Sequence, residues 1–125
     1  YCKERLQGRS LRGAKFPDQA ADPIIVHPDI RRMLMTVRVF QEGARALAYW
    51  AGLQVDIIRK HPDPETRRKA EDLLGLLTPV MKTYFTDMGF TSANLCLQCF
   101  GGHGYIAQWG MEQFVRDARI TQIYE

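Results

Sequence analysis

The sequence lacks the long features that would place the chain in a membrane or on a nucleic acid. No apolar run approaches the roughly 18 residues that a transmembrane helix needs. The 17 lysines and arginines are offset by 14 aspartates and glutamates, and both signs are spread along the chain, so the formal net charge is +3. Nucleic-acid tails and polybasic membrane anchors depend on blocks of basic residues. We therefore expect no membrane span and no nucleic acid among the partners.

Cysteine is also scarce, with only Cys2, Cys96 and Cys99. An odd count without a secretory signal favours reduced thiols in a compartment like the cytosol or the mitochondrial matrix over a disulfide framework. Cys96 and Cys99 form a Cys-x-x-Cys pair, but no second pair or histidine cluster accompanies them. The three histidines have neither the spacing nor the acidic companions of a metal site. Buried packing is the favoured role of this pair, and no metal site is expected.

The chain opens on Tyr1 and has no start methionine. Its 125 residues, 46% of them hydrophobic, suit one domain or part of one. We expect a segment of a longer protein, truncated at both ends.

The alternation typical of β-strands is missing, and apolar residues instead recur at steps of three and four, which predicts an all-α fold. Pro28 suits the first position of a long helix, and the prolines at 62 and 64 force a turn after it. A second helix is predicted from about residue 65 to 99, kinked or restarted at Pro79. The result is an antiparallel long-helix bundle. The apolar stripe of the first helix is Met33, Val37, Phe40, Ala44, Leu47, Ala51, Val55 and Ile58.

The remaining segments are shorter. Residues 1–8 are predicted to be the end of a helix, and residues 9–28, rich in glycine, proline and aspartate, an ordered surface loop. Three glycines within residues 101–104 should break the second helix and permit positive φ or close approach of a ligand. A last short helix is predicted near residues 111–116.

The glycine-rich run Phe100-Gly101-Gly102-His103-Gly104 allows two interpretations. It is not the Gly-x-Gly-x-x-Gly fingerprint of dinucleotide-binding folds, and it follows a helix where those folds have a strand. It could serve only as a tight turn between helices. Its functional interpretation is a backbone surface that lets a phosphate or a ring come close, and composition alone favours the turn.

A longer pattern around this run resembles a known family. Residues 98–105 (QCFGGHGY), 116–119 (RDAR) and 122–125 (QIYE) resemble, without a gap, the C-terminal signature of the acyl-CoA dehydrogenases. Residues 1–5 (YCKER), followed by Gly8, resemble the Tyr-x-x-x-Arg segment that opens the C-terminal helical domain of that family. Residues 10–26, 61–65 and 105–112 resemble the larger bacterial members of the family, which include 3-methylmercaptopropionyl-CoA dehydrogenases.

The resemblance implies a flavoenzyme that uses FAD to convert an acyl-CoA thioester to the trans-2-enoyl-CoA. It implies that Arg5, Gln98, Gly101 and Gly102 contact the pyrophosphate or adenosine half of an FAD held by the adjoining subunit. These residue types suit the task, because arginine donates a fork of hydrogen bonds to phosphate and glycine removes the side chain that would hold a cofactor away. Without the resemblance, Arg5 would be interpreted as a solvated charge.

The resemblance also implies roles for the last two residues. Tyr124 would line the thioester pocket, and Glu125 would be the catalytic base that takes the α-proton of the substrate. The backbone N–H of Glu125 would help to polarise the thioester carbonyl. The alternative is a glutamate without a role.

The implied partners are an acyl-CoA substrate, electron-transfer flavoprotein as the electron acceptor, and further copies of the chain in a dimer or tetramer. The implied location is the bacterial cytoplasm, or the mitochondrial matrix in a eukaryote. The isolated chain is expected to be inactive, because the remaining domains would hold most of the FAD and CoA sites. The alternative function is a non-catalytic module for oligomerisation or partner binding on the same fold.

Overall fold

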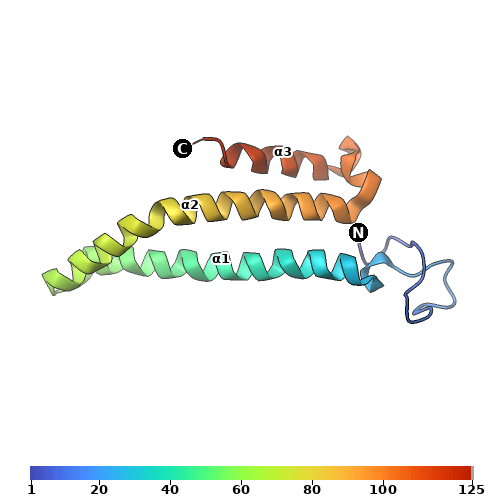
Figure 1. The fold of residues 1–125 in the computed structure, drawn as a ribbon, viewed down its shortest axis with the longest axis horizontal. Helices are drawn as coiled ribbons and strands as arrows, with labels where there is room; N and C mark the ends of the chain where they lie inside the picture. Colours follow the sequence, from blue (N-terminus) through green and yellow to red (C-terminus); the bar gives the residue numbers. More distant parts are fainter. Residues whose placement is uncertain (125) are drawn as a thin grey trace.

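Three helices form the body of the molecule in the computed structural model, which describes residues 1–124. The two longest, α1 (Pro28–Lys60) and α2 (Pro64–Phe100), run antiparallel, and α3 (Met111–Thr121) lies along α2 on the side away from α1 (Figure 1). Three 3-10 helices lie in the connections. They are η1 (Ile24–Val26), η2 (Gly101–Tyr105) and η3 (Ala107–Trp109). The predicted all-α, antiparallel long-helix bundle is confirmed.

Helix α1 begins and ends as the sequence predicts. Pro28 occupies the start of the helix, where its missing N–H costs nothing. Asp29 in the first turn and Arg59 and Lys60 in the last turn complement the helix dipole. Every residue of the predicted apolar stripe is buried or half-buried. The stripe is therefore the face that α1 turns toward the interior.

Helix α2 is continuous through its internal proline. At its start, the Asp63 side chain accepts hydrogen bonds from the backbone N–H groups of Glu65 (3.3 Å) and Thr66 (3.0 Å), which is the usual N-cap arrangement. Pro79 lies inside the helix, which bends in its first half (Figure 1). Of the two predicted outcomes at Pro79, a kink or a restart, the structure shows one bent helix.

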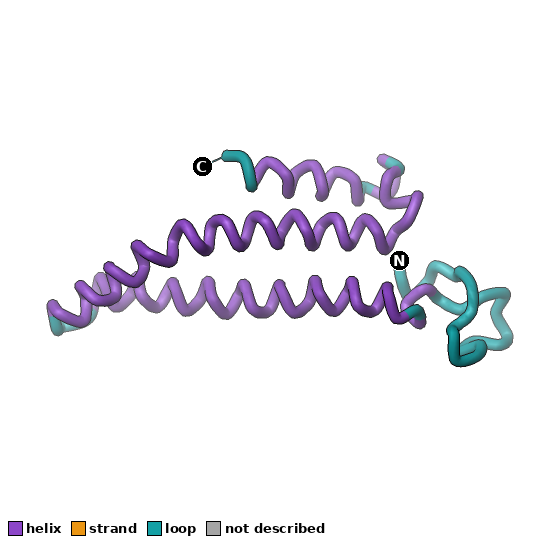
Figure 2. Tube along the Cα trace, viewed as in Figure 1, coloured by secondary structure: helices purple, strands orange, loops and turns teal. Residues whose placement is uncertain are grey.

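The prediction that residues 1–8 end a helix is wrong. The Arg5 N–H donates to the Tyr1 carbonyl (2.9 Å), which makes a single turn. The chain then becomes extended, and Leu6 forms an isolated antiparallel bridge with Pro23. A helix cannot continue there, because the backbone bonds of this stretch are made with a segment that returns from the connector rather than with the preceding turn. Figure 2 shows the N-terminal region as loop.

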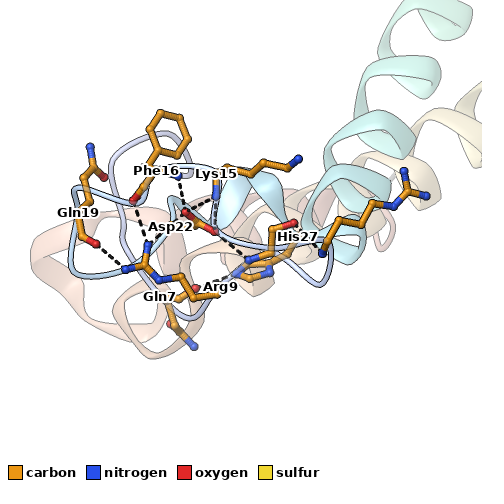
Figure 3. Close-up of polar contacts among 9 residues, drawn as sticks. Gln7, Arg9, Lys15, Phe16, Gln19, Asp22 and His27 are labelled. Carbon is orange, nitrogen blue, oxygen red and sulfur yellow. Dashed lines mark hydrogen bonds and ion pairs between the residues drawn. The ribbon is translucent and has the colours of Figure 1, made fainter.

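The connector between this segment and α1 is organised by one buried carboxylate, that of Asp22, whose side chain has no exposure to solvent (Figure 3). It accepts hydrogen bonds from the backbone N–H groups of Ser10 (2.8 Å), Lys15 (3.0 Å) and Phe16 (2.9 Å). The Arg9 guanidinium lies 3.5 Å away. These contacts confirm the predicted ordered loop.

The same contacts set the ionisation of Asp22. The hydrogen bond from the Ser10 N–H, followed by those from Phe16 and Lys15 and the charge of Arg9, lowers its pKa from 3.8 to about 2, against the opposing effect of burial. A carboxyl group with a depressed pKa stabilises the fold at every pH above its unfolded value. This stabilisation should be lost as the pH falls from 3.8 through about 2.

The three cysteines are free thiols, and Cys99 is buried while Cys2 and Cys96 are half-buried. Burial raises the pKa of Cys99 to about 11 and raises that of Cys96 as well, so both remain protonated at neutral pH. Among the described residues, no three histidine, cysteine or acidic side chains come together in a way that could hold a metal ion. Cys99 thus packs in the core, as its segment predicts.

Much apolar surface remains uncovered, because two long helices side by side enclose little volume. Within residues 1–124, no helix has both the length and the apolar character that crossing a bilayer requires. Uncovered apolar faces of this extent usually meet another domain or subunit. The exposed large apolar side chains include Met35, Val39, Tyr49, Trp50 and Leu53 on α1 and Phe114 and Ile120 on α3.

Replacing Asp22 by asparagine tests the role of the buried carboxylate. The substitution keeps the size of the side chain but removes its charge and one acceptor, so we expect the connector to open more often. Trypsin should then cleave after Arg12 and Lys15 about tenfold faster, because cleavage follows the population of the open form. The matched control is Asp18→Asn, an exposed position in the same connector, which should keep the wild-type rate. Equal cleavage of Asp22→Asn and the unmodified protein would show that the carboxylate does not organise the loop.

Candidate functional site

The turn that follows α2 depends on two glycines. Gly101 adopts φ 58° and ψ −140°, a conformation that residues with a side chain rarely reach, and its N–H donates to the Gln98 carbonyl. Gly104 is buried, and a Cβ added there would lie 2.7 Å from the Leu97 carbonyl oxygen and 2.9 Å from Cβ of Phe100. The fold itself therefore requires glycine at both positions.

Gly102 differs from these two glycines. Its φ is not positive, and an added Cβ would meet nothing within 4 Å among the described residues. Neither the backbone conformation nor packing within residues 1–124 calls for glycine at this position. Its bare backbone therefore offers an open surface to a group from outside the chain.

An aromatic cluster holds the turn in place. The Tyr1 ring stacks on Phe100 with centroids 4.3 Å apart, and its hydroxyl donates to the Phe100 carbonyl (3.1 Å). The same hydroxyl lies 2.9 Å from Nδ1 of His103, whose ring stacks on Trp109 at 4.9 Å. Residues from the two ends of the chain thus fix the start of the glycine turn.

A hollow of about 350 Å³ lies beside this cluster and contains three of the four residues predicted to bind a cofactor: Arg5, Gly101 and Gly102. Gln98, the fourth, is exposed on the last turn of α2 and does not line the hollow. The Arg5 side chain is exposed, and it has no carboxylate partner within residues 1–124. The other lining residues are Tyr1, Gln7, Phe100, His103 and Ile106.

A larger hollow, of about 810 Å³, lies between α2 and α3, and none of the predicted site residues lines it. Its lining is largely apolar and includes Phe90, Leu97, Val115 and Ile120. Tyr105 and the signature residues Arg116, Asp117 and Arg119 also line it, although the sequence analysis assigned them no site.

The second group of predicted residues follows α3, which continues past its predicted end to Thr121. The Lys82 ammonium on α2 donates to the backbone carbonyls of Thr121 (3.0 Å) and Tyr124 (2.6 Å). Asp87, also on α2, accepts a hydrogen bond from Nε2 of Gln122 (2.7 Å). Two α2 side chains that the sequence analysis did not single out therefore hold this segment.

The predicted substrate-lining residue Tyr124 is exposed, with the Lys82 ammonium 5.6 Å from its ring centroid. The predicted catalytic base, Glu125, lies outside the described residues. The glycine turn, which lines the hollow with Arg5, precedes α3, and the segment with Tyr124 follows it. The two therefore lie at opposite ends of α3, whose ends can be followed in Figure 1.

Comparison with known proteins gives a consistent result. A 3-methylmercaptopropionyl-CoA dehydrogenase of Ruegeria pomeroyi is 42% identical to the chain over 125 residues, covering 100% of the chain and 21% of the relative. A butyryl-CoA dehydrogenase of Syntrophomonas wolfei is 33% identical over 125 residues, 100% of the chain and 20% of that protein. The broad-specificity linear acyl-CoA dehydrogenase FadE5 of Mycobacterium tuberculosis is 33% identical over 128 positions, again with 100% and 21% coverage.

The chain therefore spans about a fifth of the length of these relatives. The family described as "acyl-CoA dehydrogenase, C-terminal domain" matches residues 4–125. With nearly its whole length matched and the predicted helical bundle observed, the chain belongs to the acyl-CoA dehydrogenase family, in which it corresponds to the C-terminal domain.

Proposed function

We propose that this chain completes the FAD site of an acyl-CoA dehydrogenase and carries its catalytic base. The observation that carries the proposal is the meeting of Arg5 with Gly101 and Gly102 in one hollow, although they come from opposite ends of the chain. Among the described glycines that have no positive φ and no atom within 4 Å of an added Cβ, Gly102 is the one that lines this hollow. A group bound in the hollow could therefore approach its backbone closely.

The residues present fit the phosphate-bearing half of FAD. An exposed guanidinium without a carboxylate partner among the described residues can donate two parallel hydrogen bonds to a phosphate. The bare backbone at Gly102 lets a flat or anionic group come within contact distance. Gln98, exposed one turn earlier at the end of α2, has a side-chain donor and acceptor to offer. A bound FAD would accept the hydride that leaves the β-carbon of the substrate.

Glu125 is proposed to take the α-proton. As Glu125 takes the α-proton, a hydride would leave the β-carbon, and the double bond of the trans-2-enoyl-CoA would form. The carboxylate would gain the proton, and a bound FAD would supply the acceptor for the hydride. A carboxylate can do this only in a site dry enough to raise its basicity. Tyr124, its neighbour in the chain, would help to line the thioester pocket.

The substrate class proposed is an acyl-CoA thioester, because the relatives are named for 3-methylmercaptopropionyl-CoA, butyryl-CoA and linear acyl-CoAs. These names differ in the acyl group while matching the same segment. We infer that the acyl group is selected partly by parts of the protein outside this chain, which spans about a fifth of these relatives. Electron-transfer flavoprotein is the proposed electron acceptor.

The chain is also proposed to work in a homo-oligomer. The exposed apolar residues of α1 and α3 form faces that a solvated monomer would not keep open. We propose that these apolar faces are covered by further domains of the same protein and by a second subunit, in a dimer or tetramer.

Substitutions in the hollow test the flavin contact in the full-length protein. Arg5→Ala removes the phosphate donors and should raise the dissociation constant for FAD about tenfold to a hundredfold, the effect of losing a charge-assisted hydrogen bond. Gly102→Val should weaken FAD binding through added bulk while the fold is kept, because the side chain meets open space within the chain. Equilibrium dialysis and thermal unfolding of the apoprotein would measure both effects.

The matched controls are Arg12→Ala in the exposed connector and Gly75→Val on the exposed side of α2, where an added Cβ also meets nothing within 4 Å. Both should bind FAD as the unmodified protein does. Unchanged FAD affinity in Arg5→Ala and Gly102→Val would exclude the hollow as a flavin contact.

Replacing Glu125 by glutamine tests the catalytic base, because it keeps the size of the side chain and removes the proton acceptor. Flavin reduction by acyl-CoA, followed by stopped-flow absorbance, should slow by about 10² to 10⁴ or more, while flavin content and ligand binding persist. Glu71→Gln, an exposed position on α2, serves as the control. Reduction of Glu125→Gln at the wild-type rate would place the base elsewhere. A full-length protein that binds no flavin would instead support the non-catalytic module.

A further inference from the structure

Lys82 is bonded differently from the other helical lysines that have a described partner. Lys60 and Lys69 each pair with a carboxylate one turn away on their own helix, at 3.7 Å. The Lys82 ammonium instead reaches from α2 to the segment after α3, where it donates to the backbone carbonyls of Thr121 (3.0 Å) and Tyr124 (2.6 Å). Two donors of one ammonium are thereby directed to the backbone of another part of the chain.

Capping explains only one of these bonds. Thr121 is the last residue of α3, so its carbonyl lacks a partner within the helix, and a lysine near a helix C-terminus commonly supplies one. Tyr124 lies beyond the helix, yet it receives the shorter of the two bonds. A charge-assisted bond of this length is among the stronger kinds of protein hydrogen bond.

The Tyr124 carbonyl belongs to the peptide group that joins Tyr124 to Glu125. The C–N bond of a peptide has partial double-bond character, so the carbonyl oxygen and the following N–H lie in one conjugated plane. A cation bound to the oxygen fixes that plane, and it withdraws electron density so that the N–H becomes a stronger donor.

We propose that Lys82 is a positioning residue for the dehydrogenation reaction, which orients and polarises the Tyr124–Glu125 peptide group so that its N–H can bind the carbonyl oxygen of an acyl thioester. This inference rests on the proposed function, in which Glu125 takes the α-proton of the same thioester. Polarisation of the carbonyl acidifies the α-proton, because negative charge develops on that oxygen as the proton leaves. Lys82 thus acts on the proton transfer without contact with the substrate.

A second, separate contact keeps the segment on α2. Asp87 accepts a hydrogen bond from Nε2 of Gln122 (2.7 Å), and the Arg119 guanidinium donates to Oε1 of the same amide (2.8 Å). These bonds do not involve Lys82. Loss of the Lys82 ammonium should therefore leave the segment in place and change mainly the peptide group that follows Tyr124.

The test uses the full-length flavoenzyme. Lys82→Met keeps the apolar stem and removes the ammonium, and it should slow flavin reduction by acyl-CoA about tenfold to a hundredfold, near or below the loss measured for a direct oxyanion donor. Flavin content, melting temperature and acyl-CoA affinity should stay close to those of the unmodified enzyme. Lys82→Arg, which restores a cationic donor, should recover most of the rate. Lys69→Met on the same helix is the control and should leave the rate unchanged.

A spectroscopic measurement separates positioning from mere stability. A CoA thioester in which sulfur replaces the β-carbon cannot be dehydrogenated, and a ¹³C label on its carbonyl makes the C=O stretch visible by difference infrared spectroscopy. The stretch of this bound ligand should move to higher frequency in Lys82→Met than in the unmodified enzyme, because the carbonyl is less polarised. An unchanged frequency would overturn the proposal, even if the rate falls.

The outcomes also distinguish this inference from the proposed function. A wild-type rate of flavin reduction in Lys82→Met, together with an inactive Glu125→Gln, would overturn the role of Lys82 alone. Full activity in Glu125→Gln would remove the reaction step on which Lys82 is proposed to act, and both proposals would fall together.

Discussion

Helix α3 can lie along α2 only because the chain reverses direction immediately after Phe100. The reversal depends on Gly101, whose φ of 58° suits glycine, and on Gly104, whose missing side chain leaves room for the Leu97 carbonyl. The same reversal creates both candidate sites. It exposes the bare backbone of Gly102 at one end of α3, and it brings the residues after α3 back beside the middle of α2 at the other end.

The two proposed functions, FAD contact and proton transfer, lie at these two ends of α3. At the glycine turn, the exposed Arg5 and the bare backbone of Gly102 suit a phosphate. A phosphate is held by positive charge and by close contact with donors, and it does not need a deep pocket. At the far end, side chains of α2 hold a short segment whose peptide groups would face a thioester. Both arrangements leave much apolar surface on α1 and α3 uncovered, which suits a segment that works against other domains.

The long helices could be predicted because their signals are local: proline at the helix boundaries and apolar spacing within each helix. Residues 1–8 were predicted wrongly because their backbone bonds are made with the returning connector, which no local pattern reveals. Neither composition nor residue spacing could predict that Arg5 lies next to Gly102. Only the family resemblance suggested that the two residues share a site. The contacts of Lys82 could not be predicted, because its partners are backbone carbonyls. Every residue has such a carbonyl, so the sequence does not indicate which ones a lysine will bind. The assignment of Glu125 remains a prediction from the resemblance.

The central claim is that this chain supplies one wall of a flavin site, and a crystal structure of the full-length protein grown with FAD tests it most directly. We expect an FAD phosphate within hydrogen-bond distance of the Arg5 guanidinium, with the backbone of Gly102 in contact with the cofactor. An FAD bound with Arg5 in solvent and the glycine turn uncovered would contradict the account.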